Sequence, residues 1–215
     1  MNIKIMGNFK TGTSSLQNIL LNAIKGKYIL LNCRHVSEFD KADILIVPIR
    51  RHYEIFISGF FQDITKKEYK YCYNIDKNII LNEDIDKLVN FFLKFEWNNE
   101  KHLNFNYLIE FINKTVELND INLVNKEYLV KECKYKKNDK TLKIIFIKYT
   151  SLKKERVKEI FDDLLGIDIK FKKKLYHSNN GEKKWYSAKY MEFKKEIEKH
   201  PEFIKKYEYL DKNLF

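Results

Sequence analysis

The first fifteen residues constrain the fold of this chain more than any other segment. Ile3 to Met6 is a short, mostly apolar run with β-branched residues, which predicts a buried strand. A segment of mostly small residues follows, and apolar residues then recur with helical spacing at Leu16, Ile19, Leu20, Ala23 and Ile24. A strand that leads through a loop into a helix indicates an α/β fold, in which helices cover a parallel sheet.

Later apolar runs extend this pattern. The stretches Tyr28–Cys33 and Ile44–Ile49 predict two more parallel strands, because strands buried on both faces are continuously apolar. Tyr128–Val130 and Leu142–Ile147 predict a hairpin with its turn at Lys137–Lys140. We therefore expect a three-layer αβα fold with a central, mostly parallel sheet.

Helical periodicity accounts for much of the remaining chain. Apolar positions predict helices over Tyr53–Phe61, Ile85–Phe95, Leu103–Ile112, Val157–Leu165 and Tyr186–Ile197, and Pro201 begins a short terminal one. Only six glycines and two prolines occur, so nothing indicates a flexible linker. A single domain over residues 1–215 is the simplest organisation.

The loop after the first strand has the composition of a phosphate site. Backbone N–H groups of such a loop, and of the first turn of the next helix, attract anions. Gly7 and Gly12 have the G-x4-G spacing of a P-loop. However, Thr13 and Ser14 follow Gly12 in place of Lys-Ser/Thr, and the lysine lies inside the loop at Lys10. This departure argues against an ordinary magnesium-dependent ATPase or GTPase.

The segment Lys10-Thr11-Gly12-Thr13-Ser14-Ser15 resembles the loop with which sulfotransferases hold the 5′-phosphosulfate of 3′-phosphoadenosine-5′-phosphosulfate (PAPS). The resemblance implies the P-loop-containing nucleotide hydrolase-like fold of that family, PAPS as sulfuryl donor and 3′,5′-adenosine bisphosphate (PAP) as product. It also implies that all six residues contact the cofactor. Lys10 would further stabilise the bridging oxygen as it leaves, and no metal ion is implied.

A second element of that family is an arginine at the end of a later strand, with a serine eight residues beyond it. Here Arg50 follows Ile44–Ile49, and Ser58 lies eight residues further on. The resemblance implies that both hold the 3′-phosphate, since a guanidinium offers forked donors and a hydroxyl adds one more. Arg51 takes the place of Arg50 if the register slips by one residue.

Near the C-terminus, Lys184-Trp185-Tyr186-Ser187 is similar to a signature of bacterial proteins described as capsular polysaccharide synthesis proteins. The similarity implies a hydroxyl of a carbohydrate or surface polysaccharide as acceptor, and Lys184 as a contact of the 3′-phosphate. We expect Trp185 and Tyr186 to pack in the core, because aromatic residues at helical spacing are usually buried.

Sulfuryl transfer also needs a base, which in the family is a His or Glu shortly after the second strand. His35 and Glu38 occupy that part of the chain, and we rank His35 first because imidazole titrates near neutral pH. Asp40 and His177 are further candidates, and His52 is a candidate for nucleotide contact.

One stretch departs from the family pattern. The family often has an acidic residue after the strand predicted at Leu142–Ile147, where this chain has Tyr149-Thr150-Ser151-Leu152. The departure leaves that position without an expected role.

Charge and composition leave alternative functions open. The net charge of +11 favours anionic partners, and we expect a nucleotide and a glycan but no nucleic acid. One alternative is a non-catalytic protein that binds a nucleotide, another anion or nucleic acid, supported by the interleaved Lys and Tyr residues of Lys66–Tyr71. Another is a small P-loop kinase.

Location is inferred from three features of the sequence. The three cysteines are widely spaced, and neither a signal peptide nor a transmembrane segment is recognisable. We therefore expect a cytoplasmic location, with peripheral contact at the inner face of the membrane as a further option.

Overall fold

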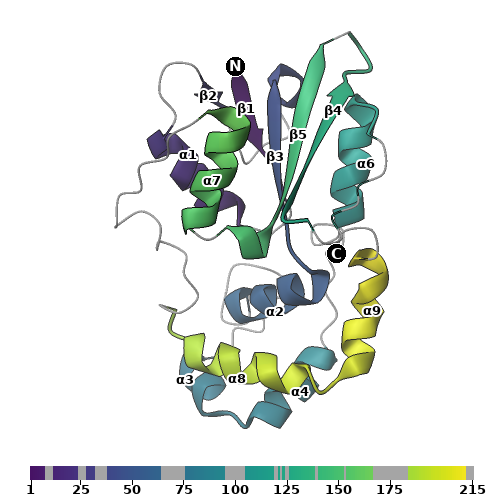
Figure 1. The fold of residues 1–215 in the computed structure, drawn as a ribbon. Helices are drawn as coiled ribbons and strands as arrows, with labels where there is room; N and C mark the ends of the chain where they lie inside the picture. Colours follow the sequence, from purple (N-terminus) through teal and green to yellow (C-terminus); the bar gives the residue numbers. More distant parts are fainter. Residues whose placement is uncertain are drawn as a thin grey trace.

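The structure is a computed structural model that describes residues 1–7, 12–23, 28–31, 38–63, 76–94, 105–118, 121, 123, 126–138, 140–152, 154–166 and 184–211. Its centre is a five-stranded sheet in the order β2-β1-β3-β5-β4 (Figure 1). The strands are β1 (Asn2–Ile5), β2 (Ile29–Leu30), β3 (Ile44–Ile49), β4 (Tyr128–Lys134) and β5 (Thr141–Lys148).

Four of these strands run parallel, and only β4 pairs antiparallel, with β5. β3 lies at the centre of the sheet, and every one of its residues is buried. It pairs with β5 from Ile44 opposite Lys143 to Ile49 opposite Lys148. The predicted α/β class, the mostly parallel sheet and the hairpin are thereby confirmed.

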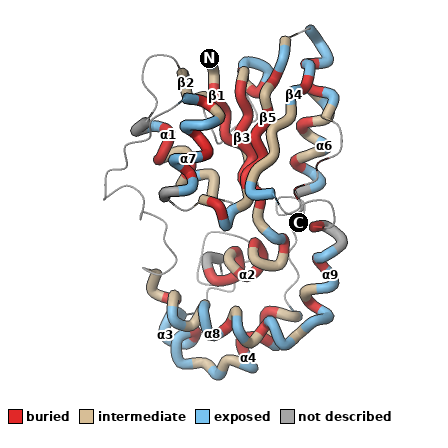
Figure 2. Tube along the Cα trace, in the orientation of Figure 1, coloured by how far each residue is buried: buried red, intermediate tan, exposed pale blue. Residues whose placement is uncertain are grey.

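Helices lie on both faces of the sheet. Alternate residues of β3 point to opposite faces, as in any strand. Ile44 and Ile46 pack in a cluster with α1 (Thr13–Ala23) and α7 (Lys154–Leu165). Leu45 and Val47 pack on the other face in a cluster with α6 (Phe105–Thr115). Figure 2 shows the buried strands between these helices.

A group of helices lies beyond the carboxyl ends of the parallel strands (Figure 1). It comprises α2 (His52–Asp63), α3 (Lys77–Asn82), α4 (Ile85–Leu93), α8 (Ser187–Ile197) and α9 (Pro201–Asp211). Aromatic rings join these helices: the Phe60 ring lies 5.0 Å from that of Phe92 and 5.7 Å from that of Phe193. Edge-on and offset ring contacts of this length add to the stability that burial provides.

The expected packing of the C-terminal aromatic residues is observed. Tyr186 is buried, with its ring 5.4 Å from that of Phe61, and the half-buried Trp185 packs against the same cluster. Helix α3 was not expected from the sequence. Asp76 caps this helix. Ile80 is its only buried residue, so the sequence lacks the repeated apolar positions that would predict a helix.

A buried pair of side chains joins the start of α2 to the end of α9. Asp211, at the end of α9, accepts hydrogen bonds from the backbone N–H of His52, the first residue of α2. Its Oδ1 also lies 2.6 Å from Nδ1 of His52, which is fully buried. Asp211 therefore acts as an N-terminal cap for α2, supplied by a distant part of the chain.

None of the described helices has both the length and the apolar character that crossing a bilayer requires.

Candidate functional site

The order of the strands defines a place where a ligand is expected. From β1 the chain proceeds to β2 on one side, whereas β3 flanks β1 on the other. In open parallel sheets, ligands bind at such a switch point, outside the carboxyl ends of the strands. The loop that ends at Gly12 follows β1, and Arg50 follows β3, so two predicted motifs meet at this switch point.

Gly12 has a backbone conformation that suits glycine. Its φ is +95°, and a Cβ atom placed on it would lie 2.7 Å from Cδ1 of Leu152 and 3.2 Å from the Tyr149 ring. Both the positive φ and the lack of space disfavour a side chain. Gly12 therefore packs closely against the segment after β5 just where α1 begins.

Helix α1 starts at Thr13, and the Leu16 N–H donates to the Gly12 carbonyl over 3.0 Å. Thr13 and Ser15 are half-buried and Ser14 is exposed. The first N–H groups of a helix have no intrahelical acceptor, and the helix dipole is positive there. The predicted loop residues in this turn thus lie where an anion is stabilised.

Arg50 is held by three side chains from three elements. Its Cζ lies 4.4 Å from the centroid of the Tyr149 ring, in a cation–π arrangement. Its Nε donates to Oε2 of Glu54 over 3.3 Å, and its Nη2 donates to the hydroxyl of Tyr190 over 3.3 Å. Because Tyr149 also lies beside Gly12, one ring contacts both predicted motifs.

The charges around Arg50 are linked to α8. The Nζ atom of Lys194 donates to Oε1 of Glu54 over 2.9 Å, so each carboxylate oxygen faces one cation. Burial acts to raise the pKa of Glu54, but the charges and hydrogen bonds of Arg50 and Lys194 outweigh it and lower that pKa. Burial likewise acts to lower the pKa of Arg50, but Tyr190, Glu54 and Tyr149 together raise it. All three charges are therefore maintained at neutral pH.

A cavity of about 270 Å³ lies beside these groups. Its lining is Ile49, Arg50, Arg51, Tyr53, Glu54, Lys148, Tyr149 and Thr150. Burial and, secondarily, the charge of Arg51 lower the pKa of Lys148, although Glu127 opposes this. Pockets for drug-sized ligands occupy roughly 300–1,000 Å³, so this cavity suits an anionic group and part of what it is attached to.

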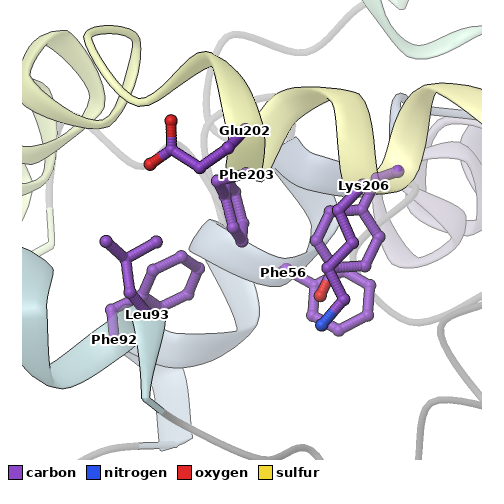
Figure 3. Close-up of a pocket in the computed structure, with 7 residues that line it drawn as sticks. Phe56, Phe92, Leu93, Glu202, Phe203 and Lys206 are labelled. Carbon is purple, nitrogen blue, oxygen red and sulfur yellow. The ribbon is translucent and has the colours of Figure 1, made fainter.

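A second cavity, of about 250 Å³, lies between α2, α4 and α9 (Figure 3). Its lining is Phe56, Phe92, Leu93, Glu202, Phe203, Lys206 and Tyr207. Phe203 projects from α9 into the space between the other two helices. None of these lining residues was predicted from the sequence to belong to a functional site.

Ser58 lies on α2, on the face that contacts the C-terminal segment, and Lys184 lies in that segment just before α8. The half-buried Ser58 shares a face of α2 with Glu54 and Phe61, which contact Lys194 and Tyr186 of the C-terminal segment. The Nζ atom of Lys184 lies 5.5 Å from the centroid of the Tyr186 ring. Neither Ser58 nor Lys184 is among the described residues that line the Arg50 cavity.

The candidate base Glu38 lies at the other end of the sheet. It precedes the short helix η1 (Phe39–Lys41), has a φ of 72° and pairs with Lys41 over 3.3 Å. The Tyr135 hydroxyl fixes η1 beside the turn between β4 and β5, at the amino ends of β3 and β5. The structure therefore does not bring Glu38 to Arg50, nor does it bring Asp40, which lies in η1.

Several predicted residues are outside the part of the chain that the structure describes. They are Lys10, Thr11, His35 and His177. Within the described residues, no cluster of three or more His, Cys, Asp or Glu side chains is arranged to hold a metal ion.

The sequence contained a signal for only some of the residues around Arg50. Glu54 is four residues after Arg50 on a predicted helix, and the i, i+4 rule indicates that pair. Tyr149 lies two residues after the predicted strand Leu142–Ile147, in the stretch that departs from the family pattern. Nothing in the sequence linked Tyr190 or Lys194 to the Arg50 site, because each contacts a residue 140 positions away.

Comparison with known proteins does not identify a relative. No protein-family model matches the sequence, and neither a curated protein nor a solved structure is significantly similar to it.

Proposed function

We propose that this protein is a PAPS-dependent sulfotransferase that transfers a sulfuryl group to a hydroxyl of a carbohydrate or surface polysaccharide. The observation that carries the proposal is the meeting of Gly12 and Arg50 at the Tyr149 ring, at the switch point of the parallel sheet. Two separate motifs, each suited to a phosphate, are adjacent in space. A nucleotide with phosphates at both its 5′ and 3′ positions needs two such sites. We also propose that the α/β fold is the P-loop-containing nucleotide hydrolase-like fold of the sulfotransferase family.

The proposed roles follow from the chemistry of the side chains. Lys10, Thr11 and the start of α1 bind the 5′-phosphosulfate, and Arg50 binds the 3′-phosphate with Ser58 and Lys184. Arg50 suits this role because it stays charged and its orientation is restrained by its neighbours. Lys148 and Arg51 add positive charge at the same cavity.

The proposed reaction is an in-line displacement at sulfur. The acceptor oxygen forms a bond to sulfur while the bond from sulfur to the bridging phosphate oxygen breaks, and PAP leaves with that electron pair. Lys10 stabilises the charge on the bridging oxygen. The acceptor proton passes to a base, for which His35 stays the first candidate, since Glu38 lies at the opposite end of the sheet.

Binding of PAP tests the proposal most directly. Calorimetry should show that PAP binds at least about tenfold more tightly than ATP with magnesium. Arg50→Ala and Lys10→Ala should each weaken PAP binding by about tenfold or more. Arg156→Ala is a matched control, because Arg156 pairs with Glu127 and Glu159 on the exposed side of α7.

The outcomes separate the proposal from its alternatives. Equal affinity for the two nucleotides, or no effect of Arg50→Ala, would overturn it. Tighter binding of ATP with magnesium would favour a kinase. Tight PAP binding without transfer of sulfate from PAPS to any glycan would favour a non-catalytic nucleotide-binding protein.

A further inference from the structure

The carboxylate of Glu54 lies between two cations from different parts of the fold. Its Oε2 accepts from Nε of Arg50 over 3.3 Å, and its Oε1 accepts from Nζ of Lys194 over 2.9 Å. Its side chain is only 16% exposed. With both oxygens engaged, the carboxylate has a defined orientation, which an exposed surface pair would not have.

We propose that Glu54 is a positioning residue, which holds the guanidinium of Arg50 in the orientation that receives the ligand's phosphate, and that Lys194 in turn holds Glu54. This inference rests on the proposed function. It adds a role for Glu54, which lines the cavity, and for Lys194 of α8, neither of which was expected from the sequence to act on the nucleotide.

The geometry distinguishes positioning from competition. Glu54 contacts Nε and Tyr190 contacts Nη2, and these two atoms form one edge of the planar guanidinium. An anion bound at the other edge, formed by Nη1 and Nη2, would leave the contact between Glu54 and Nε in place. If Glu54 instead competed with the ligand, that contact would have to break on binding.

The ring of Tyr149 restrains the same group from another direction. Its centroid lies 4.4 Å from Cζ of Arg50, whereas Glu54 and Tyr190 contact Nε and Nη2. Three contacts from three elements together restrict the orientation of the guanidinium. A preorganised arginine loses less side-chain entropy when the ligand binds, and this is the gain that Glu54 provides.

The network also connects the ligand site to α8. Lys194 and Tyr190 are one turn apart on that helix, and both contact the Arg50–Glu54 pair. The pKa of Lys194 is raised, because its hydrogen bond with Glu54 and that residue's charge outweigh the opposite effect of burial. Lys194 is therefore protonated at neutral pH and able to hold Glu54.

A double-mutant cycle tests this role, with PAP as the probe. In the wild-type background, Glu54→Ala should weaken PAP binding about five- to tenfold, and Glu54→Gln about threefold, because the amide keeps an acceptor oxygen but loses the charge. In the Arg50→Ala background, Glu54→Ala should change PAP affinity by less than about twofold, since it acts only through Arg50. The Km for PAPS should rise by the same factor as the Kd for PAP, with kcat nearly unchanged.

Glu196→Gln is the matched control. Glu196 lies on α8, as Lys194 does, and pairs over 2.6 Å with the exposed Lys199 just beyond the end of that helix. Its substitution should leave PAP affinity unchanged. Thermal unfolding of each variant checks the fold, and Glu54→Gln carries the cycle if Glu54→Ala does not fold.

The outcomes test the positioning role of Glu54 separately from the sulfotransferase proposal. An equal loss on Glu54→Ala in both backgrounds, or no loss in the wild type, overturns the positioning role and leaves the sulfotransferase proposal intact. Failure of the wild-type protein to bind PAP overturns both.

Discussion

The guanidinium of Arg50 lies over the ring of Tyr149, with Cζ 4.4 Å from the ring centroid. This contact joins the residue after β3 to the residue after β5, across two neighbouring parallel strands. The same ring lies beside Gly12, at the end of the loop that follows β1. Tyr149 thus connects the segments after three adjacent strands, and its ring, more than its hydroxyl, makes these contacts.

Replacing this ring should weaken ligand binding. A cation–π contact contributes about 0.5–2 kcal/mol, so Tyr149→Ala should reduce PAP affinity by about two- to thirtyfold in calorimetry. Tyr149→Phe keeps the ring and should stay within about twofold of wild type. A similar loss in both variants would contradict a role for the ring over Arg50.

Gly12 should tolerate substitution less well than Gly166, the other glycine with positive φ in the part of the chain that the structure describes. At Gly12, alanine would combine a φ of +95° with a Cβ 2.7 Å from Leu152, and we expect a loss of about 2–4 kcal/mol in the free energy of unfolding. At Gly166, φ is +60° and an added Cβ meets no atom within 4 Å among the described residues beyond its neighbours in the chain, so alanine should cost about 1 kcal/mol. Urea denaturation measures both, and equal losses would contradict the close approach at Gly12.

The buried pair of His52 and Asp211 should contribute to stability. Asp211→Ala removes the cap of α2 and the partner of a buried imidazole, so unfolding should become easier by about 3 kcal/mol. Glu202→Gln is the control, because Glu202 pairs with His200 at the surface of α9 and should matter by less than about 0.5 kcal/mol. Chemical denaturation measures the free energy of unfolding of both variants. Equal losses for Asp211→Ala and Glu202→Gln would show that Asp211 does not hold α9 to α2.

The charge on Glu54 should make its stabilising effect depend on pH. Its pKa in the folded protein is lowered below the ordinary value of 4.5. The stabilisation is therefore fully present above about pH 5 and is lost as the pH falls through the lower, folded-state pKa. At neutral pH, wild type should be about 1–2 kcal/mol more stable than Glu54→Gln. This difference in the free energy of unfolding should shrink as the pH is lowered below 4.5, and a difference that stays constant through that acid range would contradict the ion-pair network.

Local patterns predicted most of the elements, because the relevant forces act over a few residues. β3 has the predicted bounds, since six consecutive apolar residues are stable only where both faces of a strand are covered. Helix α7 ends before Gly166, whose positive φ terminates it. The short helix α3 escaped prediction, because it buries a single residue and its stability depends on packing.

The candidate site was likewise predicted only in part from local sequence. The residue types and spacing of the loop and of Arg50 and Ser58 are local properties, and by themselves they indicate phosphate chemistry. The identity of the catalytic base could not be predicted from position in the chain. Glu38 was expected near the site, but η1 carries it to the amino ends of the strands, at the far end of the sheet from Arg50.

The order of elements and the guanidinium after β3 follow from the sequence alone, and the sequence also predicts an anion site at the loop that ends at Gly12. The residues that hold this guanidinium follow from tertiary packing: Tyr149, Tyr190 and, through Glu54, Lys194. The physical reason is that these contacts span up to 140 residues and depend on strand order and on the packing of α8 against α2. Residue propensities and periodicity act over one or two turns and carry no information at that distance.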